Sequence, residues 1–158
     1  MKKIFIKREQ TIPFTKEGYQ KVLDEKIKLL SERPEAVEHL RKSREMGDLS
    51  ENGYYKASRQ RLSFLDSRIR RIERLVRLGR IVVSTGNNQV EIGNVVTITD
   101  STKEYTYTVV GGYESDPLNK TISNFSPIGR ALIGKKKNDS VEVSAPSGIK
   151  RYTIVKIT

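Results

Sequence analysis

At residues 44–55 the sequence reads Arg44-Glu45-Met46-Gly47-Asp48-Leu49-Ser50-Glu51-Asn52-Gly53-Tyr54-Tyr55, here called the tip segment. It combines two glycines with acidic side chains and lies between two long stretches that are strongly basic. In both stretches apolar residues recur at spacings of three and four, which is the pattern of a coiled-coil seam. Two such helices joined by a short turn that contains glycine are expected to pack as an antiparallel hairpin.

The first helix is expected to begin after Thr15, because its hydroxyl can accept a hydrogen bond from an N–H of the first turn. Pro34 removes one backbone hydrogen bond, so a kink or short break is expected near Arg33. The second helix is expected to end at Gly79. The predicted seam of the first helix holds Tyr19, Leu23, Ile27, Leu30, Pro34 and Val37. The predicted seam of the second helix holds Tyr55, Ser58, Leu62, Leu65, Ile69, Ile72 and Val76.

The apolar period changes from helical to strand-like after Ile81. Residues 94–100, 105–110, 141–143 and 152–157 are rich in β-branched and aromatic residues and are expected to form strands. A short helix is expected over residues 128–133, after Pro127. We therefore predict an α+β protein, with a coiled-coil hairpin in residues 1–80 and a small antiparallel sheet with one short helix in residues 81–158.

The net charge of +11 favours a polyanionic partner, and most of it falls in the first half. Residues 1–80 hold 21 Lys and Arg against 12 Asp and Glu, whereas residues 81–158 hold 9 against 7. The absence of cysteine excludes disulfides and thiolate metal sites. No apolar run is long enough to cross a bilayer, so we expect a cytoplasmic protein without a membrane partner.

Asp48 and Glu51 in the tip segment admit two interpretations, which are compatible with each other. Their spacing of three fits a capping pair at the start of the second helix. Two carboxylates at the end of a hairpin also suit a hard cation such as Mg²⁺, which often takes only one or two protein carboxylates. A helix N-terminus would favour the ionised form that a metal needs.

The basic residues of the second helix also leave two interpretations open, a solvated outer face or a nucleic-acid contact. Asp66 and Glu73 are too few to pair with all of them. The basic residues concerned are Lys56, Arg59, Arg61, Arg68, Arg70, Arg71, Arg74 and Arg77.

Two further features predict no site. The run from Gly129 to Lys136 fits G-x-x-x-x-G-K but lacks the following Ser or Thr and a preceding buried strand, so it does not predict a nucleotide-binding loop. His39 is the single histidine and has no partner for a catalytic triad.

Two motifs in the right order resemble the bacterial Gre family of transcript-cleavage and transcription elongation factors (GreA/GreB-like). The first is Gly47-Asp48-Leu49-Ser50-Glu51-Asn52 with Tyr55 and Ala57. The second runs from Ile122 to Lys135, and Ala145-Pro146-Ser147-Gly148 resembles the family's Thr-Pro-Gly-Gly turn. The resemblance covers residues 11–158. It implies a coiled coil that enters the secondary channel of RNA polymerase and an FKBP-like second domain that docks at the channel mouth.

The resemblance also implies how such a protein acts. It would stimulate the polymerase's own Mg²⁺-dependent cleavage of backtracked RNA and would not be an enzyme by itself. Asp48 and Glu51 would help to hold the second Mg²⁺ and the attacking water. Arg44 and Arg59 would lie near the RNA 3′ end or DNA, and Ser126 and Pro127 would contact the polymerase. We expect it to bind the polymerase as a monomer.

Departures from the family pattern keep two other functions open. Gly53-Tyr54-Tyr55 replaces the usual Ala-Glu-Tyr, so one tip acid is missing, and Phe125 precedes Ser126 where an acidic or Asn residue is usual. The missing acid favours a channel-binding inhibitor that promotes no cleavage. The FKBP-like resemblance suggests a prolyl isomerase or chaperone, although residues 81–158 lack Trp for an aromatic-lined pocket.

Overall fold

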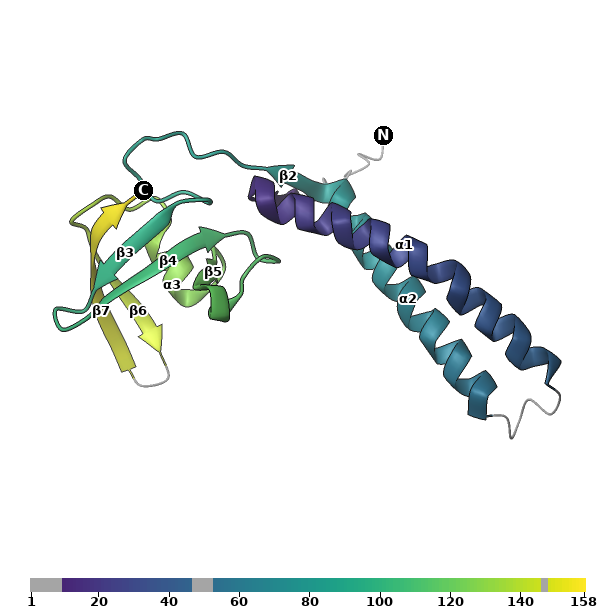
Figure 1. Ribbon diagram of the computed structural model, residues 1–158. Coiled ribbons are helices and arrows are strands. Elements are labelled where there is room, and N and C mark those ends of the chain that lie inside the picture. The colour runs from purple at the N-terminus through teal and green to yellow at the C-terminus, as the bar shows by residue number, and fades with distance from the viewer. Residues whose placement is uncertain (1–9, 47–52, 146–147) are drawn as a thin grey trace, which may run out of the picture. The chain divides into compact units, whose positions relative to one another are not determined.

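The computed structural model describes residues 10–46, 53–145 and 148–158 (Figure 1). These residues form two compact units. Residues 20–78 make up one unit, and the described residues before them join residues 79–158 in the other. Within the described part of the chain, no helix is long and apolar enough to cross a membrane.

The first unit is an antiparallel pair of helices, as predicted. Helix α1 spans Lys16–Glu45 and helix α2 spans Gly53–Leu78, and the two lie side by side in Figure 1. At 1.5 Å per residue, α1 is about 45 Å long. Helix α2 ends directly before Gly79, also as predicted. Its buried residues are Ser58, Leu65, Ile69, Ile72, Leu75 and Leu78, which confirms most of the predicted seam of this helix.

The predicted seam of α1 is wrong by one residue along the helix. The buried positions of α1 that are spaced by seven are Val22, Leu29, Ala36 and Ser43. Ile27, Leu30 and Val37 are instead 68%, 44% and 40% exposed. Both sets obey heptad spacing, so periodicity alone could not choose between them. The set that is buried ends in the small residues Ala36 and Ser43.

Pro34 does not break α1, because the helix continues from Lys16 to Glu45. The predicted break is therefore wrong, while the alternative, a kink near Arg33, stays a prediction. The packed residues Leu29 and Ala36 on either side of it hold the helix together despite one lost hydrogen bond. The N-terminus follows the prediction, since the hydroxyl oxygen of Thr15 accepts a hydrogen bond from the Gly18 N–H at 3.0 Å.

Ion pairs join the two helices along the hairpin. Arg33 Nε lies 2.8 Å from Asp66 Oδ1, and Arg68 pairs with Glu25. These side chains are partly exposed, so each pair contributes about 1 kcal/mol or less. The ion pairs therefore favour one register, while the buried seam supplies most of the stability.

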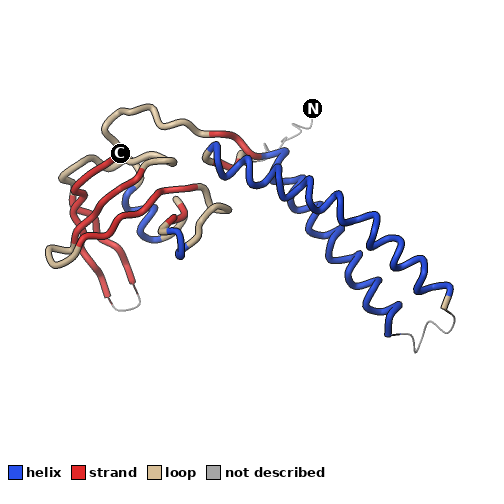
Figure 2. The backbone as a smooth tube through the Cα atoms, viewed as in Figure 1, coloured by secondary structure: helices blue, strands red, loops and turns tan. Residues whose placement is uncertain are grey.

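The second unit contains a five-stranded sheet in the order β5-β4-β3-β7-β6. Its strands are β3 (Val95–Thr99), β4 (Glu104–Val110), β5 (Thr121–Ser123), β6 (Ser140–Ala145) and β7 (Gly148–Ile157). Figure 2 shows the strands in red and the short helix α3 (Pro127–Leu132) beside them.

The four predicted strands are present, but the sheet is mixed where a purely antiparallel one was expected. Strand β5 pairs with β4 in parallel, with Val109 opposite Ile122. The reason is the connection between them, because the chain returns through the 3₁₀ turn η1 (Pro117–Asn119) and enters β5 in the direction of β4. Strand β5 was not predicted, because the polar residues around it show no alternation of apolar and polar side chains.

The core of the second unit lies between the sheet and α3. Val96 and Ile98 of β3, Ile154 of β7 and Leu132 of α3 are fully buried. The other members of the core are Val90, Val109, Val141, Val143 and Tyr152. Burial of branched residues that alternate along β3 and β6 explains why these segments were recognisable as strands.

A separate two-stranded sheet pairs β1 (Ile12–Phe14) with β2 (Gly79–Ile81) in parallel. Glu114 joins the end of β1 to the loop after β4, because its carboxylate accepts hydrogen bonds from the N–H groups of Thr15 and Gly111 and from the Thr15 hydroxyl. Gly18 leaves room for this carboxylate, since a Cβ at this position would lie 1.7 Å from Glu114 Oε2 and would displace it.

Candidate nucleic-acid and partner-binding surfaces

The two carboxylates predicted to act at the tip segment, Asp48 and Glu51, lie outside the described residues. The structure describes the helix ends on both sides of them. Among the described residues, no group of three or more His, Cys, Asp or Glu side chains could hold a metal ion. The Mg²⁺ prediction therefore rests on the chemistry of the donor set, two carboxylates of the kind that Mg²⁺ prefers.

A polar contact ties the two helices together just before the tip. His39 Nδ1 on α1 lies 2.7 Å from the Tyr54 hydroxyl in the first turn of α2, and the two rings meet edge to face at 6.2 Å. Nε2 of the same His39 ring lies 3.3 Å from Glu35. His39 thus positions the start of α2. Sequence reasoning missed this role because the two residues are 15 positions apart.

The two predicted nucleic-acid contacts lie on opposite sides of residues 47–52 in the sequence. Arg44 is in the last turn of α1 and Arg59 is in the second turn of α2, and both side chains are exposed. Neither has a carboxylate partner among the described residues. Arg59 also lines an open hollow of about 510 Å³ on the outer side of α2.

Six positions on the outer side of α2 carry basic residues or serine and no carboxylate, while the exposed Glu73 lies next to Arg74. Positions 56, 59, 63, 67, 70 and 74 recur at spacings of three and four, on the face opposite the buried seam. Asp66 pairs with Arg33, while Arg61 and Arg68 pair with carboxylates of α1. Within the described chain, the basic residues of this face that have no carboxylate partner include Lys56, Arg59, Arg70 and Arg74.

Phe64 lies beside this basic face and is 62% exposed. It lines the same hollow as Lys56 and Arg59. An exposed aromatic ring among cations is the combination that binds single-stranded nucleic acid, through base stacking and phosphate contacts. The sequence carried a signal for Phe64, because this residue falls outside the apolar repeat of the helix.

The residues predicted to contact the polymerase, Ser126 and Pro127, lie at the start of α3. The Ser126 hydroxyl accepts a hydrogen bond from the Gly129 N–H at 3.0 Å and donates one to the Ser123 carbonyl at 2.7 Å. Pro127 is exposed at the first helical position. Ser126 therefore has a structural function as a helix cap, whatever it contacts in a complex.

Phe125 precedes this cap and presents an aromatic side chain that is 59% exposed. Its backbone is held by Arg130 Nε, which donates to the Phe125 carbonyl at 2.8 Å, and by the Ser123 hydroxyl, which accepts from its N–H. Its ring lies against Gly112, where a Cβ would approach it to 2.9 Å. The residue is therefore fixed in an exposed position.

These features define the class of protein: an α+β chain with a helical hairpin of basic outer face and a small mixed sheet with one short helix. The family model described as "Transcription elongation factor, N-terminal" matches residues 12–81. The model described as "Transcription elongation factor, GreA/GreB, C-term" matches residues 85–158. The chain belongs to this GreA/GreB family of transcription elongation factors.

Curated relatives are similar over nearly their whole length. The transcription elongation factor GreA of Lactococcus lactis is 40% identical over 154 residues, which cover 94% of this chain and 99% of the relative. GreA of Staphylococcus aureus is 41% identical over 147 residues, covering 90% of this chain and 93% of the relative. GreA of Cereibacter sphaeroides is 39% identical over 153 residues, which cover 94% of this chain and 97% of the relative.

Solved structures show similarity at lower identity. GreA factor homolog 1 (Gfh1) of Thermus thermophilus is 24% identical, with a TM-score of 0.45, and the match covers 94% of this chain and 99% of that one. A GreA/GreB factor from Nitrosomonas europaea is 24% identical, with a TM-score of 0.42, covering 63% of this chain and 92% of that one.

Proposed function

We propose that this protein binds RNA polymerase and stimulates the polymerase's own cleavage of backtracked RNA. The observation that carries the proposal is the match of both family models, together with relatives about 40% identical over more than 90% of the chain. The protein would act as a cofactor of the polymerase, in the bacterial cytoplasm, and its own chain would not carry a complete catalytic centre.

The two parts of the chain would have different functions. The hairpin would enter the secondary channel and present Asp48 and Glu51 to the polymerase active site. Residues 81–158 would dock at the channel mouth through Ser126 and Pro127. A Mg²⁺ ion held jointly with the polymerase would activate a water molecule for hydrolysis. The carboxylates of this chain would bind the ion, while Arg44 and Arg59 would contact RNA phosphates.

The basic outer face of α2 supports the nucleic-acid part of the proposal. Lys56, Arg59, Arg70 and Arg74 are free of carboxylate partners among the described residues, so their positive charge is available to phosphates. Phe64 adds a surface on which an unpaired base can stack. A single-stranded RNA end has both phosphates and unpaired bases.

The experiment that tests the proposal uses a stalled, backtracked elongation complex and measures RNA length and polymerase binding in parallel. Asp48→Ala and Glu51→Ala should each abolish the stimulated cleavage and leave the affinity for polymerase nearly unchanged. If either change removed binding as well, Asp48 and Glu51 would instead act as helix caps. A matched control is Glu45→Ala, which removes an exposed carboxylate at the end of α1.

A channel-binding inhibitor is the second candidate function, and one observation favours it. Tyr54, which replaces the third tip acid of the family pattern, is used in the contact with His39. An inhibitor would slow elongation or initiation and produce no shortened RNA, so the same assay separates the two functions.

A further inference from the structure

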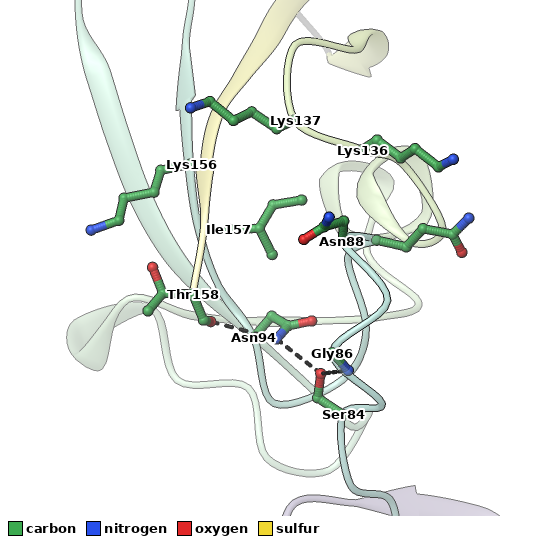
Figure 3. A pocket seen from close by; sticks show the side chains of 10 residues that line it. Ser84, Gly86, Asn88, Asn94, Lys136, Lys137, Lys156, Ile157 and Thr158 are labelled. Atoms are coloured by element: carbon green, nitrogen blue, oxygen red, sulfur yellow. Dashed lines mark hydrogen bonds between the residues drawn. The ribbon is translucent and has the colours of Figure 1, made fainter.

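A hollow of about 520 Å³ lies at one end of the mixed sheet (Figure 3). It is formed by three segments that are distant in sequence: the loop after β2, the loop after α3 and the end of β7. Its lining residues are Ser84, Gly86, Asn88, Gln89, Asn94, Lys136, Lys137, Lys156, Ile157 and Thr158. This volume lies within the range of small-molecule sites.

Hydrogen bonds from Asn94 fix the floor of the hollow. Its side-chain amide donates to the Ser84 hydroxyl at 3.2 Å and to the Thr158 carbonyl at 3.5 Å, as Figure 3 shows. Its side-chain oxygen accepts the Glu91 N–H at 2.7 Å. One side chain thus fastens the loop after β2 to the end of β7.

Backbone contacts fix the third segment. The Val90 N–H donates to the Lys135 carbonyl at 2.8 Å, and the Gly134 N–H donates to the Val90 carbonyl at 2.9 Å. Gln89 forms an antiparallel bridge with Lys136. The loop that carries the lysines is therefore held against the loop that carries the amides, and the hollow is formed without a ligand.

The charged side chains that line the hollow all carry positive charge. Lys136, Lys137 and Lys156 have no carboxylate within ion-pair distance in the part of the chain that the structure describes. The two nearby acids bind elsewhere, since Glu91 accepts hydrogen bonds from Thr85 and Asp139 accepts the Lys136 N–H at 2.8 Å. A concave surface lined by one sign of charge raises the local concentration of anions.

The remaining lining supplies neutral donors and an apolar surface. Ile157 lies between the lysines in Figure 3, with Asn88 beside it. The side-chain amides of Asn88 and Gln89 make no hydrogen bond with a described residue, so they are available to a ligand. Figure 3 shows the Lys136 and Lys156 side chains on opposite sides of Ile157, extending outward. The site thus offers cations for phosphates at its rim, amides for polar edges and an aliphatic side chain for a flat ring.

We propose that this hollow binds a phosphate-bearing small molecule of nucleotide size. It is not a Walker-type loop, because residues 127–132 form helix α3 and the lysines come from the following loop and from β7. A continuous nucleic-acid strand fits less well, because it needs cations along a track. The next basic residues of β7, Lys150 and Arg151, lie about 20 Å and about 17 Å from Lys156 at 3.3 Å per residue, and Arg151 pairs with Glu142.

The test measures binding of ATP without metal to the full chain by isothermal titration calorimetry. A variant that carries Lys136→Ala and Lys156→Ala should bind ATP about tenfold more weakly, which corresponds to the loss of one charge-assisted contact. The matched control carries Lys103→Ala and Lys150→Ala, which removes the same charge from the same half of the chain, and it should retain the wild-type affinity. The melting temperatures of both variants are compared to exclude a folding defect.

Two further measurements test which part of ATP is bound and which residues contact it. Inorganic triphosphate should compete with ATP, and NMR signals of the Asn88 and Gln89 side-chain amides should shift on ATP addition. Three results would each overturn the proposal. The first is an equal loss of ATP affinity in the two double variants, and the second is the absence of saturable ATP binding. The third is that a ten-nucleotide single-stranded RNA binds more tightly than ATP and that this RNA binding is lost in the Lys136/Lys156 variant. Stimulated RNA cleavage without added nucleotide should be unchanged in the Lys136/Lys156 variant. A failure of ATP binding would therefore count against the hollow alone, and a failure of stimulated cleavage would count against the proposed function alone.

Discussion

The Glu114 carboxylate binds the residue that precedes the first helix. It accepts hydrogen bonds from two backbone N–H groups and one hydroxyl, and Gly18 leaves the space that it occupies. These donors come from residues 99 and 3 positions away in the sequence, so spacing gave no indication of the contact.

Glu114→Ala should free the Thr15 and Gly111 N–H groups, because each loses its acceptor. Losing hydrogen bonds to a charged group costs about 1.5–3 kcal/mol each, before solvent screening reduces the effect for partly exposed groups. Hydrogen exchange of these two amides should accelerate by at least tenfold. Glu104→Ala, at an exposed strand position, should leave their exchange unchanged; acceleration in both variants would contradict a specific role of Glu114.

At the level of elements, the hairpin was predictable because glycine, capping and heptad signals all agreed. The seam of α1 was not predictable, because two sets of positions are both compatible with a heptad repeat and only packing against α2 chooses between them. The parallel strand β5 was also missed, since three residues of mixed character carry little pattern and their pairing depends on the path of the chain through η1.

The buried positions of the two helices predict different losses of stability for Ile69 of α2 and Ile27 of α1. Ile69→Ala removes a side chain that is 8% exposed and should destabilise the hairpin by about 2–5 kcal/mol. Ile27→Ala removes one that is 68% exposed and should change stability by about 0.5 kcal/mol or less. Urea unfolding followed by circular dichroism at 222 nm measures both, and a larger loss for Ile27→Ala would restore the seam predicted from the sequence.

The turn between β3 and β4 should weaken in acid. The Thr102 hydroxyl and N–H and the Lys103 N–H donate to the Asp100 carboxylate and hold its pKa well below the usual value of 3.8. Because the folded-state pKa is lowered, this stabilisation is present above about pH 4 and is lost as the pH falls further. Hydrogen exchange at Thr102 and Lys103 should show this loss, and Asp100→Ala should remove the pH dependence.

At the scale of the whole molecule, the charge is unevenly distributed, with most of the excess in the first half of the chain. The general expectation of a polyanionic partner follows from composition alone. The tip carboxylates and the polymerase contact came from motif resemblance. The hollow beside Lys136 could not be predicted from the sequence, because the fold brings its three segments together.

The outer face of α2 predicts salt-dependent binding of single-stranded RNA. Replacing Lys56, Arg59, Arg70 and Arg74 with Gln removes four cations that have no carboxylate partner among the described residues. The slope of log K against log salt concentration should become shallower by about 0.7 for each RNA phosphate that the variant no longer neutralises. Replacing Arg61 and Arg68 with Gln, which removes two cations that pair with α1 carboxylates, should change the slope less for each cation removed. An equal change per cation removed in the two variants would point to net charge alone.

The most direct measurement adds the purified protein and Mg²⁺ to a backtracked complex of RNA polymerase and follows the length of the labelled RNA with time. The account predicts that the RNA is shortened from its 3′ end faster than by polymerase alone and that the complex then resumes elongation. RNA that keeps its length, with elongation unchanged or slowed, would contradict it.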